Sequence, residues 1–295
     1  MTSLLSYLIV MVPLSIIFNL PLLFIILKKQ YLTVPFGILS AASLGISLFI
    51  IQPFFWVVLC IFFFSSSILT KMKAKEKSSI TSDFAKGSTK RDAIQVTANG
   101  IIPFLFAFGY FLFELLPNLA KSHMNPHNPF DPFFIGVFAA FAVHTADTWA
   151  TEIGILSKSP PRLVTNIRQK VDPGTSGGIT FYGSCASLLG ASLIAAVYLL
   201  FAIITSLLSI ETIIFFFLIA IGGFLGSIID SIEGAAIQGI YYCNDCKKET
   251  ETNPHKRCGN ETILHRGIQQ INNDFVNLSS ALIVTLFICL IILLL

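Results

Sequence analysis

The sequence predicts an all-α protein, a polytopic bundle of about eight membrane-spanning helices that forms a single integral membrane domain over residues 1–295. Three observations lead to this fold class. Hydrophobic residues make up 54% of the chain, charged residues only 12%, and the mean hydropathy is +0.78, values that exclude a soluble globular protein of this length. Long apolar runs recur along the chain, and the basic residues fall almost entirely between alternate runs.

A helix needs about 20 apolar residues to cross a hydrocarbon core of about 30 Å. Apolar runs close to this length lie at residues 4–27, 36–52, 53–69, 94–116, 132–153, 180–206, 212–238 and 277–295. The second and third runs are short and meet at Gln52 and Pro53, so a count of seven follows if they do not both cross. The first run has neither a basic segment before it nor an A-x-A-like cleavage site, so we expect a retained span and not a signal peptide.

The basic residues predict the orientation of the bundle, because loops kept in the cytoplasm are enriched in Lys and Arg. Of the 19 Lys and Arg residues, all except Lys121 fall on one side of the eight-helix arrangement. We therefore expect the loops on that side to face the cytoplasm and both termini to lie on the non-cytoplasmic side. The basic run from Lys71 to Arg91 is explained by topology and by anionic lipid, so no nucleic-acid partner is predicted.

Acidic residues gather at the predicted cytoplasmic ends of the helices. The candidates are Asp147 and Glu152, within HTADTWATEIG at residues 144–154, and Asp230 and Asp274. Charge inside a membrane is costly unless it is paired or lines a cavity, so these residues are functional candidates. Carboxylate and amide oxygens are the ligands of hard cations, and the four acids therefore predict a catalytic Mg²⁺ site.

Three amides are expected to orient the groups bound at this site: Asn99, Asn273 and Asn277. Asp147 and Glu152 are five residues apart, about 140° around a straight helix, so they are expected to flank a groove and not to chelate side by side. The alternative is that the acids and amides are helix caps and interfacial polar groups, for which these residue types are also favoured.

The loop between the fifth and sixth runs predicts a phosphate-binding turn. It contains GTSGGIT, residues 174–180, directly before a helix. A glycine-rich loop at a helix N-terminus presents backbone N–H groups and the positive end of the helix dipole to an anion. The expected phosphate ligands are Arg162, Gly174, Thr175, Gly177 and Gly178. Alone, such a loop is also typical of a simple turn, and it lacks the Lys-Ser or Lys-Thr of a Walker A loop.

The inner loop at residues 241–262 contains CNDCKKETETNPHKRC and predicts a small zinc knuckle. Cys243 and Cys246 form a C-x₂-C pair, and His255 and Cys258 form a second pair after a spacer of eight residues. Three Cys and one His suit tetrahedral Zn²⁺. A disulfide is disfavoured because the loop is predicted to lie on the reducing side of the membrane. An incidental C-x₂-C pair in a flexible loop is the alternative.

Seven short blocks follow one another in a characteristic order. They are SSSILTK (65–71), IQVTANG (94–100), ADTWATEIG (146–154), SKSPPRL (157–163), GTSGGIT (174–180), GSIIDS (226–231) and NDFVN (273–277). Together they resemble the domain-of-unknown-function 92 family, which includes transmembrane protein 19 and the plant phytyl-phosphate kinases. The family-like core covers residues 65–295. Transmembrane protein 19 lacks the zinc-knuckle cysteines, so the resemblance implies a structural zinc.

The resemblance implies a membrane-embedded kinase that transfers a phosphoryl group from a nucleoside triphosphate, CTP or ATP, to an isoprenyl monophosphate lipid at the cytoplasmic surface. Phosphoryl transfer needs a metal and cationic groups to neutralise the phosphates, which agrees with the Mg²⁺ site expected from the acids. A transporter or flippase of an anionic lipid or metabolite is the main alternative, although the sequence shows no internal repeat. A membrane protein without catalytic activity is the third possibility.

Overall fold

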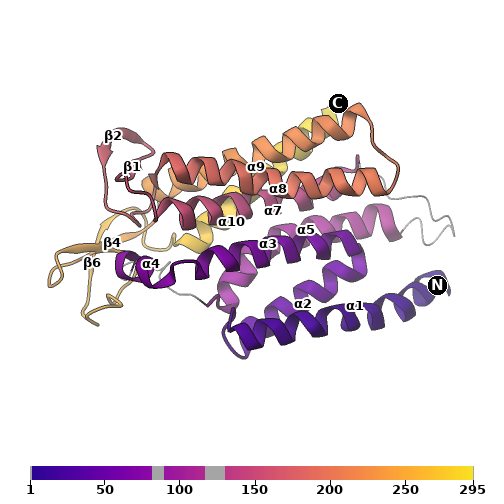
Figure 1. Cartoon of the computed structure of the whole chain (residues 1–295), viewed down its shortest axis with the longest axis horizontal. Coiled ribbons are helices and arrows are strands. Elements are labelled where there is room, and N and C mark those ends of the chain that lie inside the picture. Colours follow the sequence, from indigo (N-terminus) through magenta and orange to yellow (C-terminus); the bar gives the residue numbers. More distant parts are fainter. Residues whose placement is uncertain (1, 82–89, 117–129, 295) are drawn as a thin grey trace.

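The computed structural model describes residues 2–81, 90–116 and 130–294. The protein is mainly helical, which confirms the predicted fold class, and its long helices run side by side along one axis (Figure 1). Within the described residues, seven helices are long and apolar enough to cross a membrane: α1 (Thr2–Lys29), α3 (Pro53–Lys71), α5 (Ala93–Tyr110), α7 (Pro132–Gly154), α8 (Phe181–Ile204), α9 (Ile210–Ala236) and α10 (Asn273–Leu294).

A shorter apolar helix, α2 (Phe36–Ile51), returns the chain between α1 and α3 (Figure 1). Its 16 residues extend over about 24 Å. Gln52 separates α2 from α3 because its backbone is extended, and its side chain accepts a hydrogen bond from the Phe54 N–H at 3.4 Å. The two short runs of the sequence are therefore two distinct helices. The described residues also form two minor helical segments, α4 (Ala74–Thr81) and the π-helical η2 (Phe111–Leu115).

Polar caps fix where several of the long helices begin. Asp92 accepts a hydrogen bond from the Gln95 N–H at 2.9 Å at the start of α5, and Asp131 accepts one from the Phe134 N–H at 2.7 Å at the start of α7. A capping box between Ser209 and Thr212 starts α9. Each cap satisfies a backbone donor that the helix itself leaves unpaired.

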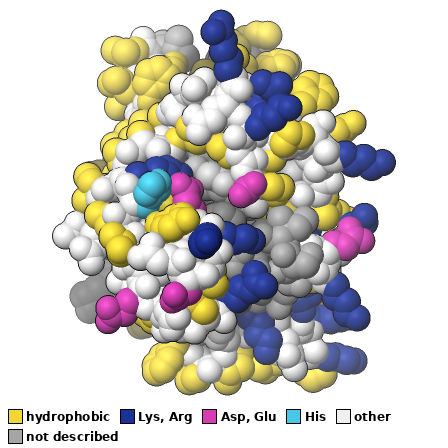
Figure 2. Space-filling view, turned by 90° about the vertical axis from the view of Figure 1, so that its left-hand side faces the viewer, with side chains coloured by type: hydrophobic (Ala, Val, Ile, Leu, Met, Phe, Trp, Pro, Cys, Tyr) yellow, Lys and Arg dark blue, Asp and Glu magenta, His cyan; other side chains and the backbone are white. Residues whose placement is uncertain are grey.

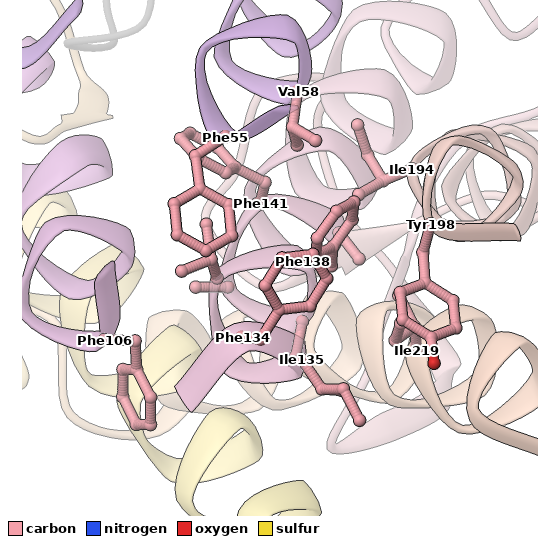
Figure 3. Packing of buried hydrophobic residues seen from close by; sticks show 14 of the residues in the cluster. Phe55, Val58, Phe106, Phe134, Ile135, Phe138, Phe141, Ile194, Tyr198 and Ile219 are labelled. Atoms are coloured by element: carbon pink, nitrogen blue, oxygen red, sulfur yellow. The ribbon is translucent and has the colours of Figure 1, made fainter. Parts of the chain in front are cut away.

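The central helix of the bundle is α7. Every residue from Phe134 to Ala146 is buried, and α3, α5, α8, α9 and α10 all contact this helix. Aromatic rings fill the space around it (Figure 3): the ring centroids of Phe134 and Phe138 are 5.3 Å apart, and Phe55 of α3 lies 5.1 Å from Phe134. Small residues allow the closest approach, since a Cβ atom added at Gly223 of α9 would lie only 2.8 Å from the Cβ atom of Ala142.

Two small antiparallel sheets lie together at one end of the bundle (Figure 1). The first has the order β2-β1-β3 and is built from β1 (Arg162–Leu163), β2 (Asn166–Lys170) and β3 (Gly178–Ile179). The second has the order β5-β4-β6 and is built from β4 (Ile240–Cys243), β5 (Lys248–Thr250) and β6 (Ile263–Arg266). The sequence did not predict these strands, because segments of two to five residues are too short for a periodic signal.

The end that carries the sheets is strongly basic, and Figure 2 shows many Lys and Arg side chains there and few acids. The start of α1 and the end of α10 both lie at the opposite end of the bundle (Figure 1). Lys86 and Lys121, which entered the count of basic residues, lie outside the described part of the chain. The cytoplasmic location of the basic end stays a prediction from the distribution of Lys and Arg.

A largely buried ion pair attaches α4 to α7. Lys77 is 5% exposed, and its Nζ lies 2.7 Å from Glu152 Oε2 and donates to the Leu69 carbonyl at 2.6 Å. The Thr70 hydroxyl donates to the other Glu152 oxygen at 2.7 Å. Both charges are therefore paired and hydrogen-bonded, the condition under which buried ions are tolerated. A second pair on α4, Lys73 with Glu76 at 3.2 Å, is 57% and 61% exposed.

The two pairs of α4 predict different costs for the same substitution. Lys77→Met removes the cation from the Glu152 carboxylate, which is only 14% exposed, and should lower the free energy of unfolding by about 3–5 kcal/mol. Lys73→Met breaks only an exposed pair and should cost less than about 1 kcal/mol. Denaturant unfolding of the purified proteins in one detergent measures both changes. Equal destabilisation by the two substitutions would contradict the conclusion that the ion pair between Lys77 and Glu152 stabilises the fold more than the exposed pair does.

Candidate functional site

A cavity of about 850 Å³, counting its open mouth, lies between α7, α8, α9 and the loop before β3. Asp147 of α7 and Asp230 of α9 both line it, so two predicted metal ligands approach the same space from different helices. Among the described residues that line the cavity none is Lys or Arg. A space bordered by two carboxylates and by no basic group suits a divalent cation.

Hydroxyl groups supply further oxygen atoms around the two acids. Ser227 and Ser231 of α9 line the cavity on either side of Asp230, and Ser187 of α8 faces it from across the space. The Ser187 hydroxyl is buried and makes no hydrogen bond within the described part of the chain. Such a group indicates a position where a ligand oxygen would be satisfied. Sequence reasoning missed these serines, although the i, i+3, i+4 spacing of Ser227, Asp230 and Ser231 signals a shared helix face.

The glycine-rich loop forms another wall of the cavity. Gly174 and Gly177 have φ values of 94° and 81°, a region that favours glycine, and Gly177 lies directly against Ala235 of α9. Within the loop, the N–H of Thr175 donates to the Asp172 carbonyl at 3.1 Å and that of Gly178 donates to the Thr175 carbonyl at 3.0 Å. Two of the backbone donors expected to bind phosphate are therefore already used in turns.

The loop leads into α8, whose first turn also lines the cavity. The Thr180 hydroxyl accepts a hydrogen bond from the Gly183 N–H at 3.0 Å and caps this helix. Gly183 also permits close packing, since a Cβ atom there would lie 2.9 Å from the Ala150 carbonyl oxygen of α7. The start of α8 is thus held against α7 beside Asp147, with its dipole directed at the cavity.

Arg266 of β6 fixes the loop from the side of the second sheet. Its guanidinium donates to the Ala235 carbonyl at 2.6 Å and to the Ser176 carbonyl at 3.3 Å. The Ser176 hydroxyl in turn donates to Gln238 Oε1 at 2.8 Å. One side chain therefore joins the end of α9, the glycine-rich loop and the second sheet. Nothing in the sequence points to this contact, because Arg266 and Ser176 are 90 residues apart.

The structure brings Asp147, Asp230, Gly174, Thr175, Gly177 and Gly178 together around this cavity. The other predicted site residues do not line it: Asn99, Glu152, Arg162, Asn273, Asp274 and Asn277.

Several of these residues have other positions or partners. Glu152 pairs with Lys77 on another face of α7, and the Arg162 guanidinium donates to the Ile167 carbonyl at 2.7 Å within the first sheet. Asn99 lines a different cavity, and Asn273 and Asp274 begin α10. Helical periodicity identifies a shared face but not the element that this face meets.

The predicted zinc ligands meet in the second sheet and its turns. One ligand atom from each of Cys243, Cys246, His255 and Cys258 lies within 4.8 Å of all the others. The sulfur atoms of Cys243 and Cys258 are 3.6 Å apart, and His255 Nδ1 is 3.2 Å from the Cys258 sulfur. Two sulfur ligands on a tetrahedral Zn²⁺ lie roughly 3.8 Å apart, given Zn–S bonds of about 2.3 Å, so the donor set fits this ion.

The first two cysteines differ in how readily they ionise. A hydrogen bond from the Cys246 backbone N–H lowers the pKa of the Cys243 thiol despite the opposite effect of burial, whereas burial raises the pKa of the Cys246 thiol to about 11. Metals bind the thiolate, so the cysteines of this cluster would release their protons on binding zinc.

Comparison with known proteins agrees with the architecture. The family described as "Integral membrane protein DUF92" matches residues 17–285. Protein PGR of Arabidopsis thaliana is 31% identical over 192 residues, which cover 63% of this chain and 65% of PGR, slightly less than two thirds of its length. An uncharacterized membrane protein of Methanocaldococcus jannaschii is 32% identical over 207 residues, covering 68% of this chain and 73% of that protein. No solved structure matches the chain. The chain therefore belongs to the DUF92 family of integral membrane proteins.

Proposed function

We propose that the cavity between α7, α8 and α9 is the active site of a Mg²⁺-dependent phosphotransferase. It would move the terminal phosphoryl group of ATP or CTP to an isoprenyl monophosphate lipid at the cytoplasmic membrane surface. The observation that carries the proposal is that Asp147 and Asp230, from two helices, line one cavity with the glycine-rich loop. The substrate class rests on the resemblance of seven sequence blocks to a family that includes the phytyl-phosphate kinases.

Phosphoryl transfer depends on positioning and on neutralising negative charge. Asp147 and Asp230 would hold Mg²⁺ directly or through water, and the hydroxyls of Ser227 and Ser231 would supply further oxygen atoms. When bound, Mg²⁺ supplies the positive charge that stabilises the transferring phosphoryl group. The described lining has no basic residue to do so. The glycine-rich loop and the start of α8 would orient the phosphates.

The position of the cavity favours transfer over transport. Asp147 and Asp230 lie near the C-terminal ends of α7 and α9, and the cavity also contacts β3. Transporters usually bind their substrates near the middle of the bilayer, between repeated halves. A site at one end of the bundle suits a reaction between a soluble nucleotide and a lipid phosphate at the membrane surface.

The second sheet would hold a structural zinc ion on Cys243, Cys246, His255 and Cys258. Zinc binding would stabilise this sheet, because such small units gain much of their folding free energy from the metal. Arg266 lies on β6 of the same sheet and holds the Ser176 carbonyl, so the effect would reach the glycine-rich loop through one side chain.

The first test of this proposal is a transfer assay. Purified protein in lipid nanodiscs, given Mg²⁺, a nucleotide labelled in its γ-phosphate and isoprenyl monophosphates, should form a labelled lipid diphosphate. Asp147→Asn and Asp230→Asn should each lower kcat/KM roughly 100-fold or more, since even the loss of a residue that only hydrogen-bonds to a metal ligand costs about 10- to 100-fold. The exposed Glu76→Gln on α4 is the matched control and should retain full activity.

The assay has two outcomes that contradict the proposal. One is an absence of transfer by folded wild type with both ATP and CTP across several isoprenyl chain lengths. The other is transfer by Asp147→Asn at the rate of the Glu76→Gln control, which would remove Asp147 from the reaction.

Metal analysis tests the zinc site. Wild-type protein purified without chelators should contain about one zinc ion per chain. The double variant Cys243→Ser, Cys246→Ser should lose the zinc, whereas Cys60→Ser, Cys185→Ser, which changes two cysteines located in helices, should keep it. Active wild-type protein that contains no zinc would refute the structural role.

A further inference from the structure

A second cavity lies on the other side of the bundle, between α1, α2, α3 and α5, and has a volume of about 630 Å³ with its mouth. Its wall is mainly apolar and includes Leu22, Ile26, Leu44, Leu59 and Phe63. Trp56 and Phe64 of its α3 wall are eight residues apart, roughly 12 Å along a helix, so the cavity is elongated along the bundle.

One charged residue lines this cavity among the residues described, and it is Arg91. The backbone of Arg91 is fixed against the α1–α2 connection: its N–H donates to the Tyr31 carbonyl at 3.0 Å, and its carbonyl accepts from the Thr33 N–H at 2.9 Å. Its guanidinium lies over the ring of Phe62, 5.2 Å from the centroid. Arg91 therefore forms a rigid cationic end to an apolar space.

The charge of Arg91 is only partly balanced by the protein. Burial lowers the pKa of Arg91 to about 10, with the Glu152 charge acting in the opposite direction, so Arg91 remains a cation at neutral pH. Glu152 is committed to Lys77 and Thr70, and within the described residues no carboxylate lies within ion-pair distance of Arg91. A partly desolvated guanidinium in this position favours an anion with two oxygen acceptors.

More positive charge surrounds the same end of the cavity. Lys71 lies 4.1 Å from the centroid of the Tyr31 ring, donates to the Lys29 carbonyl, and is close enough to Lys29 and Lys90 for both charges to act on it. Figure 2 shows how densely basic side chains cover this end of the molecule. Such a cluster attracts an anionic group and holds it at the level of the lipid head groups.

We infer that this cavity binds a single-chain lipid with an anionic head group, the hydrocarbon chain inside the cavity and the head group against Arg91. The apolar wall excludes a soluble anion as the main ligand, because such an ion would leave the elongated part of the cavity unfilled. The basic cluster excludes a neutral hydrocarbon, which would leave the charge of Arg91 uncompensated. The inference does not depend on the reaction proposed for the other cavity, whose lining residues are different.

The chain contains two Trp residues, and one of them, Trp56, lines the cavity. In a Trp149→Phe background, Trp56 is the only tryptophan, and its fluorescence is quenched when a brominated hydrocarbon chain enters the cavity.

Three dibromo-octadecyl probes are titrated at low mole fraction. They have the same chain and differ only in the head group, which is a phosphate, a carboxylate or an alcohol. The two anionic probes distinguish a lipid phosphate from a fatty acid as the source of the head group.

Saturable quenching is expected, with at least one anionic probe binding about tenfold or more tightly than the alcohol, since hydrogen bonds to charged groups are among the stronger ones. Arg91→Gln should abolish this preference. Cys60→Phe, which narrows the cavity, should weaken binding of every probe, whereas Cys185→Phe at an exposed position on α8 is the matched control and should not. Equal binding of the anionic probes and the alcohol to wild type, or equal quenching in the two Phe variants, would overturn the inference.

Discussion

The central helix α7 is enclosed by protein from Phe134 to Ala146, and the rest of the architecture follows from this enclosure. Of the seven long helices it has the lowest mean hydropathy, 1.3, and the largest buried share, 72%. A helix that lipid does not reach need not be strongly apolar, and it can carry polar residues that an outer helix could not. Its neighbours must come close to seal it, and the small residues of α9 that meet Ala142 and Val143 allow this.

The polar end of α7 is divided among several partners. Asp147 lines the cavity shared with α8 and α9, Trp149 donates to the Ser65 hydroxyl at 3.4 Å, and Glu152 forms the ion pair with Lys77. Two carboxylates on one helix, within two turns of each other, therefore have different environments. One is anchored by a cation and a hydroxyl, and the other borders a space without a described basic residue. This difference separates a group that holds the fold from one that is available to a ligand.

How far the sequence predicts the structure depends on whether a feature lies within one element or between two. The helices are predictable because each carries its own apolar run, and the separate faces of Asp147 and Glu152 follow from their spacing. Contacts between distant segments are not predictable in this way. The sequence around Lys77 does not identify Glu152, 75 residues away, as its partner, and the sequence around Arg266 does not identify Ser176. The strands were not predicted because they are too short to show a periodic pattern. The Cys and His residues were predictable as a group because their spacing alone is typical of a zinc knuckle.

The short helix α2 gives the protein two hydrophobic lengths. Its 16 residues cover about 24 Å, less than a hydrocarbon core of about 30 Å, whereas the 27 residues of α9 cover about 40 Å. Phe36 and Leu39 of α2 are 71% and 60% exposed, so this shorter length faces the surroundings. A bilayer that matches this length would be thinner beside the exposed face of α2, with its head groups closer to the midplane there than beside α1, whose 28 residues are long enough to span. The bilayer would therefore be thinner next to the second cavity, which α2 borders, than around the long helices.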